Sequence, residues 1–142
     1  TAYRRQRQMC IRDRTEIDEL RRIQARFRQA IEEQHVENRV IYNDEFHLEI
    51  GKMAHNDYLM PSLRRVLIDH ARLGKIFYRH PTTVDMQKDL ELACDQHDQI
   101  IEAIARHDTE AAGQLIREHM ELSRRRMAEY AAPEGMEVSL AL

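Results

Sequence analysis

The sequence predicts an all-α protein, built as an antiparallel bundle of roughly five helices. Proline and glycine are scarce, with three and four residues among 142, so long stretches can continue as helices. Apolar residues recur at spacings of three and four through most of the chain, which is the period of an amphipathic helix. No stretch alternates polar and apolar residues as a half-buried strand does. The length fits one domain with a real core.

The first fourteen residues differ from the rest of the sequence, because they carry five arginines and almost no apolar periodicity. Residues 8–14, which read QMCIRDR, resemble a translated sequencing adapter of the transposon mosaic-end type. We therefore expect residues 1–14 to be non-native and the true start of the gene to lie upstream. The alternative is an ordinary basic tail. Without this segment the net charge changes from −3 to −7.

The first native helix is expected over residues 15 to about 34. Thr15 is the predicted N-cap, with Asp18 in place of the usual glutamate of a capping box. Its apolar stripe consists of Ile17, Leu20, Ile23, Phe27, Ala30 and Ile31. His35 follows near the helix C-terminus, where a cation is favourable.

The second helix is expected from about residue 39 to 55, with Asn56 as its left-handed C-cap. One face combines Asn43 and His47 with apolar residues, which places polar side chains inside a stripe that must pack. The apolar members of that face are Phe46, Ile50, Met53 and Ala54.

The third helix is expected over residues 58 to 78, with Pro61 in its first turn, where a missing N–H costs nothing. Its inner stripe comprises Leu59, Leu63, Val66, Leu67, His70, Leu73 and Phe77. A loop over residues 79–83 follows, because a proline at position 81 disfavours helix in the residue before it.

Two further helices complete the predicted bundle, from about residue 84 to 106 and on to about 130. Asp108 is the predicted N-cap of the last one. Each has a histidine in the middle of its apolar stripe, His97 in one and His119 in the other. The native domain is thus expected to span residues 15–131, followed by a loose tail over 132–142.

The three stripe histidines, His47, His97 and His119, are the strongest functional signal. A single such residue is more often a hydrogen-bonded core histidine. Three such histidines lie on separate helices whose apolar stripes are expected to face one another. A single divalent metal ion bound by all three would satisfy their buried ring nitrogens most simply. His70 would line the same cavity or be a core residue, and Arg72 near it is the arginine expected to reach inward for a carboxylate.

Other function classes have weaker support in the sequence. It contains no Gly-rich phosphate loop and no His-Glu-x-x-His pair, and its serines lack a nucleophile-elbow setting, so we predict that the chain is not an enzyme. The alternatives are a hydrolase-like enzyme whose metal activates water, a di-iron bundle and a plain helical interaction module. The di-iron alternative would need a pair of Glu-x-x-His motifs on facing helices.

The amino-acid composition limits the cellular location and the partners that we expect for this chain. Cys10 and Cys94 are too few for a disulfide framework, which is typical of a reducing compartment. The apolar runs are too short to span a bilayer and no signal peptide is visible, so we expect a cytoplasmic protein without membrane contact. The net charge of −3 argues against nucleic-acid binding by this chain alone.

Several segments together resemble the FCD domain (the FadR C-terminal type) of GntR-family transcription regulators. They are NDEFHLEI at residues 43–50, HDQIIEAI at 97–104, DTEAA at 108–112, and the later His119, with Asn56 after the first segment. The spacing of the three histidines is similar to that of the family. The resemblance covers about residues 15 to 130.

The resemblance implies an antiparallel helical bundle with a central metal held by one aspartate and three histidines. His47, His97 and His119 would be ligands, but Asn43 stands where the family has its aspartate, and Asp44 one place later is the alternative. The ion would be zinc first, with nickel or manganese as alternatives.

The resemblance also implies partners. A small organic or sugar acid would bind at or near the metal as effector, with His70 and Arg72 as candidate contacts, and its carboxylate would supply the charge that Asn43 lacks. Such regulators are typically homodimers that bind operator DNA through an N-terminal winged helix-turn-helix. That domain, and with it the first helix of the FCD domain, is expected to be missing here.

Overall fold

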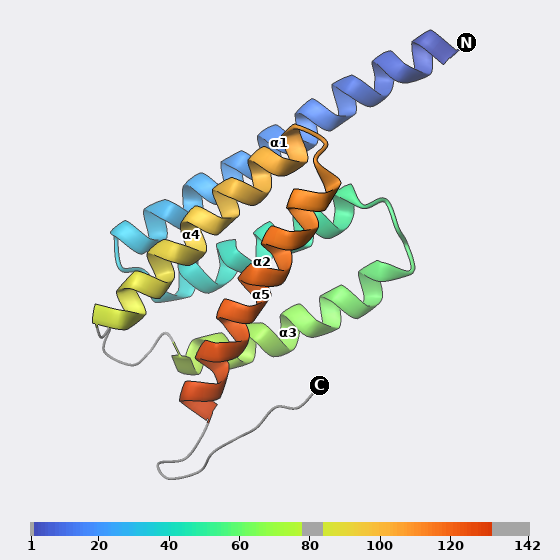
Figure 1. The fold of residues 1–142 in the computed structure, drawn as a ribbon. Coiled ribbons are helices and arrows are strands. Elements are labelled where there is room, and N and C mark those ends of the chain that lie inside the picture. Colours follow the sequence, from blue (N-terminus) through green and yellow to red (C-terminus); the bar gives the residue numbers. More distant parts are fainter. Residues whose placement is uncertain (1, 78–83, 132–142) are drawn as a thin grey trace. The chain divides into compact units, whose positions relative to one another are not determined.

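The computed structural model describes residues 2–77 and 84–131, with side chains over 14–74, 84–85 and 87–125. These residues form five α-helices and no strand (Figure 1). The helices are α1 (Ala2–Glu32), α2 (Val36–Met53), α3 (Leu59–Phe77), α4 (Val84–Ala105) and α5 (Thr109–Ala131). The all-α prediction is therefore confirmed. The predicted loop over 79–83 and the tail over 132–142 lie outside the described residues.

The helices divide into two compact units. The first contains α1, α2 and α3, and the second contains α4 and α5. Within the first unit, α2 packs against both α1 and α3, and within the second α4 packs against α5. None of the helices in the described part of the chain combines the length and the apolar character that a membrane crossing needs.

Helix α1 is longer than expected. It begins at Ala2 and continues through Thr15, so the predicted N-cap at that threonine is wrong. The physical reason is that residues 2–14 contain neither proline nor glycine, and their arginines, glutamines and methionine are good helix formers. All six residues of the predicted apolar stripe are buried, and Gln24 is buried beside them.

The junction between α1 and α2 is a Schellman motif. Gln34 has a φ of 55° and its N–H donates to the Ile31 carbonyl at 3.1 Å, while the His35 N–H donates to the Ala30 carbonyl at 3.0 Å. The same two carbonyls accept from the buried guanidinium of Arg39, at 3.1 and 3.2 Å. Both backbone and side-chain donors thus satisfy the orphan carbonyls of α1.

Arg39 was not expected in the core, yet only 2% of its surface is exposed. Its positive charge lies at the negative end of the α1 dipole, which is the role the sequence suggested for His35. His35 instead caps the start of α2, where its Nδ1 accepts from the Asn38 N–H at 3.3 Å.

The connection from α2 to α3 also differs in detail from expectation. His55, with a φ of 49°, is the left-handed residue after α2, so the prediction of Asn56 as C-cap is wrong. The side-chain oxygen of Asn56 accepts from the N–H groups of Tyr58 and Leu59, at 3.0 and 3.3 Å, and so satisfies donors at the start of α3. A short polar side chain can form hydrogen bonds at the end of one helix or at the start of the next. In this connection Asn56 accepts from N–H groups at the start of α3.

Helices α2 and α3 approach closely at Gly51, where an added Cβ would overlap the side chain of Leu63. The stripe predicted for α3 is only partly covered. Leu63 is half-buried, but Leu59 and Val66 are exposed by 43% and 63%. The expectation that the whole α3 stripe faces inward is therefore wrong for these two residues.

The second unit has a predicted cap and an apolar core. The Asp108 carboxylate accepts from the Ala111 N–H at 3.0 Å, which confirms the expected N-cap of α5. His107 ends α4 with a φ of 57°, in a Schellman motif like that of α1. The buried apolar residues here are Leu90, Ala93, Cys94, Ile100, Ile101, Ala103 and Leu122.

Candidate metal centre

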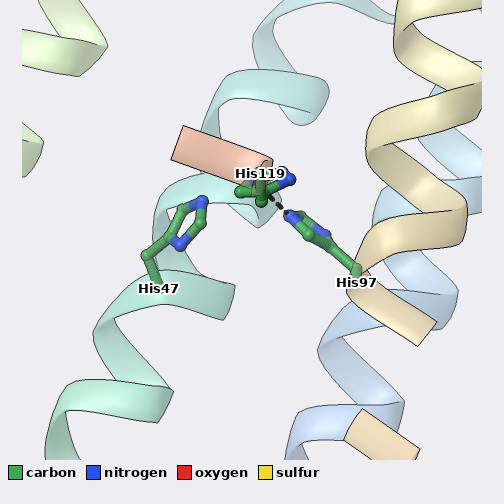
Figure 2. Close-up of side chains that lie close together, drawn as sticks. All are labelled: His47, His97 and His119. Atoms are coloured by element: carbon green, nitrogen blue, oxygen red, sulfur yellow. Dashed lines mark hydrogen bonds between the residues drawn. The ribbon is translucent and has the colours of Figure 1, made fainter. Parts of the chain in front are cut away.

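The core of the second unit contains a pair of histidines. His97 on α4 and His119 on α5 are buried, with 0% and 2% of their surface exposed. Their Nε2 atoms are 3.2 Å apart, and their rings are tilted by 53° with centroids 4.6 Å apart (Figure 2). The sequence predicted both residues on inner stripes, and the structure brings them together.

Two facing Nε2 atoms restrict the chemistry of this pair. A neutral imidazole has one N–H donor and one lone pair, so two such atoms share either a proton or a cation. Burial keeps bulk water from solvating both nitrogens, which makes a shared partner necessary. The pair is therefore suited to an N–H···N hydrogen bond or to joint ligation of one metal ion.

Gln96 contacts the other side of the His119 ring. Its side-chain oxygen Oε1 lies 3.0 Å from Nδ1 of His119. An amide oxygen only accepts, so Nδ1 carries the hydrogen in this contact. Gln96 could not be identified from the sequence, because a glutamine one residue before His97 has no helical signature that points across to α5.

In the first unit, α2 presents His47 and Asn43 on one face, since they are one helical turn apart. Asn43 is buried, with 7% of its surface exposed, and His47 is half-buried. The His47 ring meets the ring of Phe46 edge-on, with centroids 5.6 Å apart and planes at 80°. Figure 2 draws His47 on its α2 ribbon.

Asp44, the alternative to Asn43, is engaged elsewhere in the same unit. Its Oδ1 lies 2.7 Å from Nδ1 of His70 on α3, and both side chains are mostly covered, with 17% and 29% exposed. The Asn43 amide also donates to this oxygen, at 3.4 Å. The Asp44 carboxylate thus links α2 to α3, which leaves Asn43 as the better candidate ligand.

Arg72 does not reach inward as expected. Its side chain is 78% exposed, and its guanidinium lies 3.9 Å from the carboxylate of Asp69 on the same helix. Two residues along a helix correspond to about 200° of rotation, so Arg72 and the half-buried His70 lie on different faces of α3. The contacts of Arg72 and His70 with an effector stay predictions.

Two surface ion pairs shift the pKa values of their carboxylates. The hydrogen bond from Arg22 holds the pKa of Glu19 below its usual value, and Arg124 does the same for Glu121. Both pairs join residues three apart on one helix and stabilise α1 and α5 locally.

Within the described residues, His97 and His119 of the second unit, and His47 of the first unit taken by itself, each offer one ring nitrogen as a possible metal ligand. Imidazole nitrogen is a ligand that zinc, nickel and related transition ions accept. The residues present therefore fit such an ion by the chemistry of their donors.

A comparison with protein-family models finds a match over most of the chain. The family model for the FCD domain matches residues 7–122, from within α1 to within α5, and the match includes all three histidines. No curated protein and no solved structure gives a match. Because the family match covers well over half of the sequence, the chain belongs to the FCD domain family, whose members are effector-sensing regulatory domains.

Proposed function

We propose that this chain is the effector-sensing part of a GntR-type transcription regulator, with a divalent metal at its centre. His47, His97 and His119 would hold the ion, with the side-chain oxygen of Asn43 as a fourth ligand. A small organic or sugar acid would bind at an open coordination position. The observation that carries this proposal is the buried pair of facing Nε2 atoms, from His97 and His119.

The distance within this pair supports joint ligation. A zinc–nitrogen bond of about 2.0–2.1 Å and a tetrahedral angle place two ligand nitrogens roughly 3.3 Å apart. The Nε2 atoms of His97 and His119 are 3.2 Å apart. A hydrogen bond between the rings would have a similar length, so the two explanations are separated by metal content.

The charge of the ligand set explains why an acid would bind. Three neutral imidazoles and one neutral amide leave the full charge of a divalent ion uncompensated. An effector carboxylate at the open position would supply the missing negative charge. When bound, the ion would act as an electrostatic anchor for that carboxylate, and the proposal assigns no catalytic step to the chain.

The proposal also gives the domain a means of signalling. One ion would be ligated by residues from α2, α4 and α5, so effector binding would favour the arrangement of these helices that best completes the coordination. Such coupling requires different effector affinities in two conformational states. In the intact regulator, a homodimer would transmit this difference to an N-terminal DNA-binding domain.

Metal analysis of the protein purified without an affinity tag tests the proposal. We expect a near-stoichiometric content of zinc, nickel or manganese, lost in His97→Ala and retained in the control His35→Asn. This control also removes a histidine, but asparagine keeps the capping role of residue 35. Circular dichroism establishes that each variant is folded. A folded wild type that holds no metal and is not stabilised by adding any of the three ions would refute the metal centre.

The effector part of the proposal is tested on metal-loaded protein. A panel of small carboxylates and sugar acids is screened by thermal shift, with neutral analogues of the same size as controls. An acid at about 100 times its Kd adds about 2.7 kcal/mol of stability. We expect this gain for at least one acid in the metal-loaded wild type and no gain in His97→Ala. Equal shifts in both proteins would place the acid away from the metal.

A further inference from the structure

As a metal ligand, His119 would need its ring held in one orientation and one tautomer. Two contacts address this point, both within the second unit. Nδ1 of His119 lies 3.0 Å from Oε1 of Gln96, and Nε2 lies 3.2 Å from Nε2 of His97. The ring is therefore contacted at both nitrogens, and both contacts come from adjacent residues of α4.

We propose that Gln96 is a positioning residue that fixes the tautomer and orientation of His119. Its side-chain oxygen accepts the hydrogen of Nδ1, which leaves the lone pair on Nε2, the nitrogen that faces His97. This inference rests on the proposed metal centre, since a metal ligand needs its lone pair on the nitrogen that faces the ion. Outer partners of ligating histidines act in this way in metal sites generally.

The arrangement gives α4 two roles. His97 supplies one ligand, and the preceding residue orients the second ligand, which is on another helix. Neighbouring positions of a helix diverge by about 100°, but the long glutamine side chain still reaches the far side of the His119 ring. A movement of α4 would thus alter two of the three histidine ligands together.

The choice of an amide has a further consequence. A carboxylate at this position would also accept from Nδ1, but its negative charge would raise the basicity of the imidazole and partly neutralise a bound cation. The amide fixes the tautomer without adding charge. The centre therefore stays electron-poor, which favours a negatively charged effector at the open position.

Three variants test the role of Gln96 against that of an ordinary core residue. Gln96→Leu keeps a similar volume without an acceptor, and Gln96→Glu keeps the acceptor and adds charge. Gln99→Leu is the matched control, because Gln99 is an exposed glutamine on the same helix. Metal affinity is measured by competition with a chromophoric chelator, using zinc alone as the probe.

We expect zinc affinity to fall about 10- to 100-fold in Gln96→Leu, in line with the loss of an outer partner of a ligating histidine. Gln96→Glu should bind at least as tightly as wild type, and Gln99→Leu should not change. Equal affinity in wild type and Gln96→Leu would overturn the proposal. So would an equal loss in Gln96→Glu, because the acceptor would then be irrelevant.

A second readout does not depend on the metal. In metal-free protein, long-range ¹H–¹⁵N NMR spectra of the imidazoles report which ring nitrogen carries the hydrogen. We expect His119 as the Nδ1–H tautomer in wild type and in Gln99→Leu, and loss of that preference in Gln96→Leu. An Nε2–H tautomer in wild type would overturn the inference by itself. A wild type with the Nδ1–H tautomer that binds no zinc would instead refute the metal centre and support the hydrogen bond from His119 to Gln96.

Discussion

Replacing Arg39 by methionine should destabilise the first unit strongly. The guanidinium is buried and donates to the carbonyls of Ala30 and Ile31, at 3.1 and 3.2 Å. A hydrogen bond that involves a charged group contributes about 1.5–3 kcal/mol. A cation at a helix C-terminus adds about 0.3–1 kcal/mol.

The net effect is smaller than the sum of these contributions. Both carbonyls keep a backbone donor from the Schellman motif, and removing a buried charge relieves its desolvation cost. Methionine also retains most of the apolar stem. We therefore expect Arg39→Met to lower the free energy of unfolding by about 3 kcal/mol, which corresponds to roughly 10 °C in Tm for a chain of this size.

Urea unfolding followed by circular dichroism provides the measurement. Arg106→Met serves as the matched control, because Arg106 is an exposed arginine just after α4. The control should stay within about 0.5 kcal/mol of wild type. Arg39→Lys should fall between the two, since an ammonium group lacks the fork geometry that reaches both carbonyls. A midpoint for Arg39→Met equal to that of Arg106→Met would refute the assignment of Arg39 as the cap of α1.

Three other substitutions test the site, the helix packing and the surface charges. Asn43→Asp supplies a charged oxygen ligand and should tighten zinc binding at least about tenfold in a competition titration; weaker binding would show that residue 43 does not ligate. Gly51→Ala should lower the free energy of unfolding, measured in urea, by about 1 kcal/mol or more, because the added Cβ would overlap a leucine of α3. Gly113→Ala is the control: there a Cβ meets only ordinary contacts, and the free energy of unfolding should rise by up to about 1 kcal/mol. The lowered pKa of Glu19 means that its pair with Arg22 stabilises the fold above the unfolded value of 4.5, and this stability is lost as the pH falls through the folded value. Arg22→Gln should therefore lower the urea midpoint at pH 7, and this loss should shrink as the pH falls through the folded pKa of Glu19; a loss that does not change with pH would exclude this pair as the cause.

The apolar part of the buried face of α1 could be predicted from the sequence. Ile17, Leu20 and Phe27 belong to a stripe of six apolar residues, all of which are buried, because the helical period alone decides which side chains share a face. The Asp108 cap was predicted for a similar reason, since an N-cap depends on neighbours along the chain. Local pattern is sufficient for features of this kind.

Helix ends and cross-helix contacts could not be predicted in the same way. Thr15 is a suitable cap, but nothing before it stops the helix, and Asn56 caps the following helix rather than the preceding one. Arg39 was missed because its partners are carbonyls of another helix, which have no sequence signature. A polar residue just after a predicted helix end is the signal that would have suggested such a cap.

The candidate site was predicted unevenly. His97 and His119 were expected on inner stripes, and both are buried and in contact. The contact of Gln96 with His119, by contrast, depends on how α4 pairs with α5, which the sequence does not specify. Asp44 contacts His70 on α3, which was also not predicted. Periodicity selects the face on which a side chain lies, whereas its partner depends on the rotation and offset of a second helix.

The joint between α1 and α2 has a mechanical consequence. Backbone N–H groups of the connection and the guanidinium of Arg39 on α2 donate hydrogen bonds to the last turn of α1. The angle between the two helices is therefore held rigidly at this elbow. Helix α1 has 31 residues and is therefore about 46 Å long. A tilt of α2 by a few degrees, transmitted through this elbow, would displace the far end of α1 by a few ångströms. A long helix clamped at one end in this way converts a small local rearrangement into a large distant displacement.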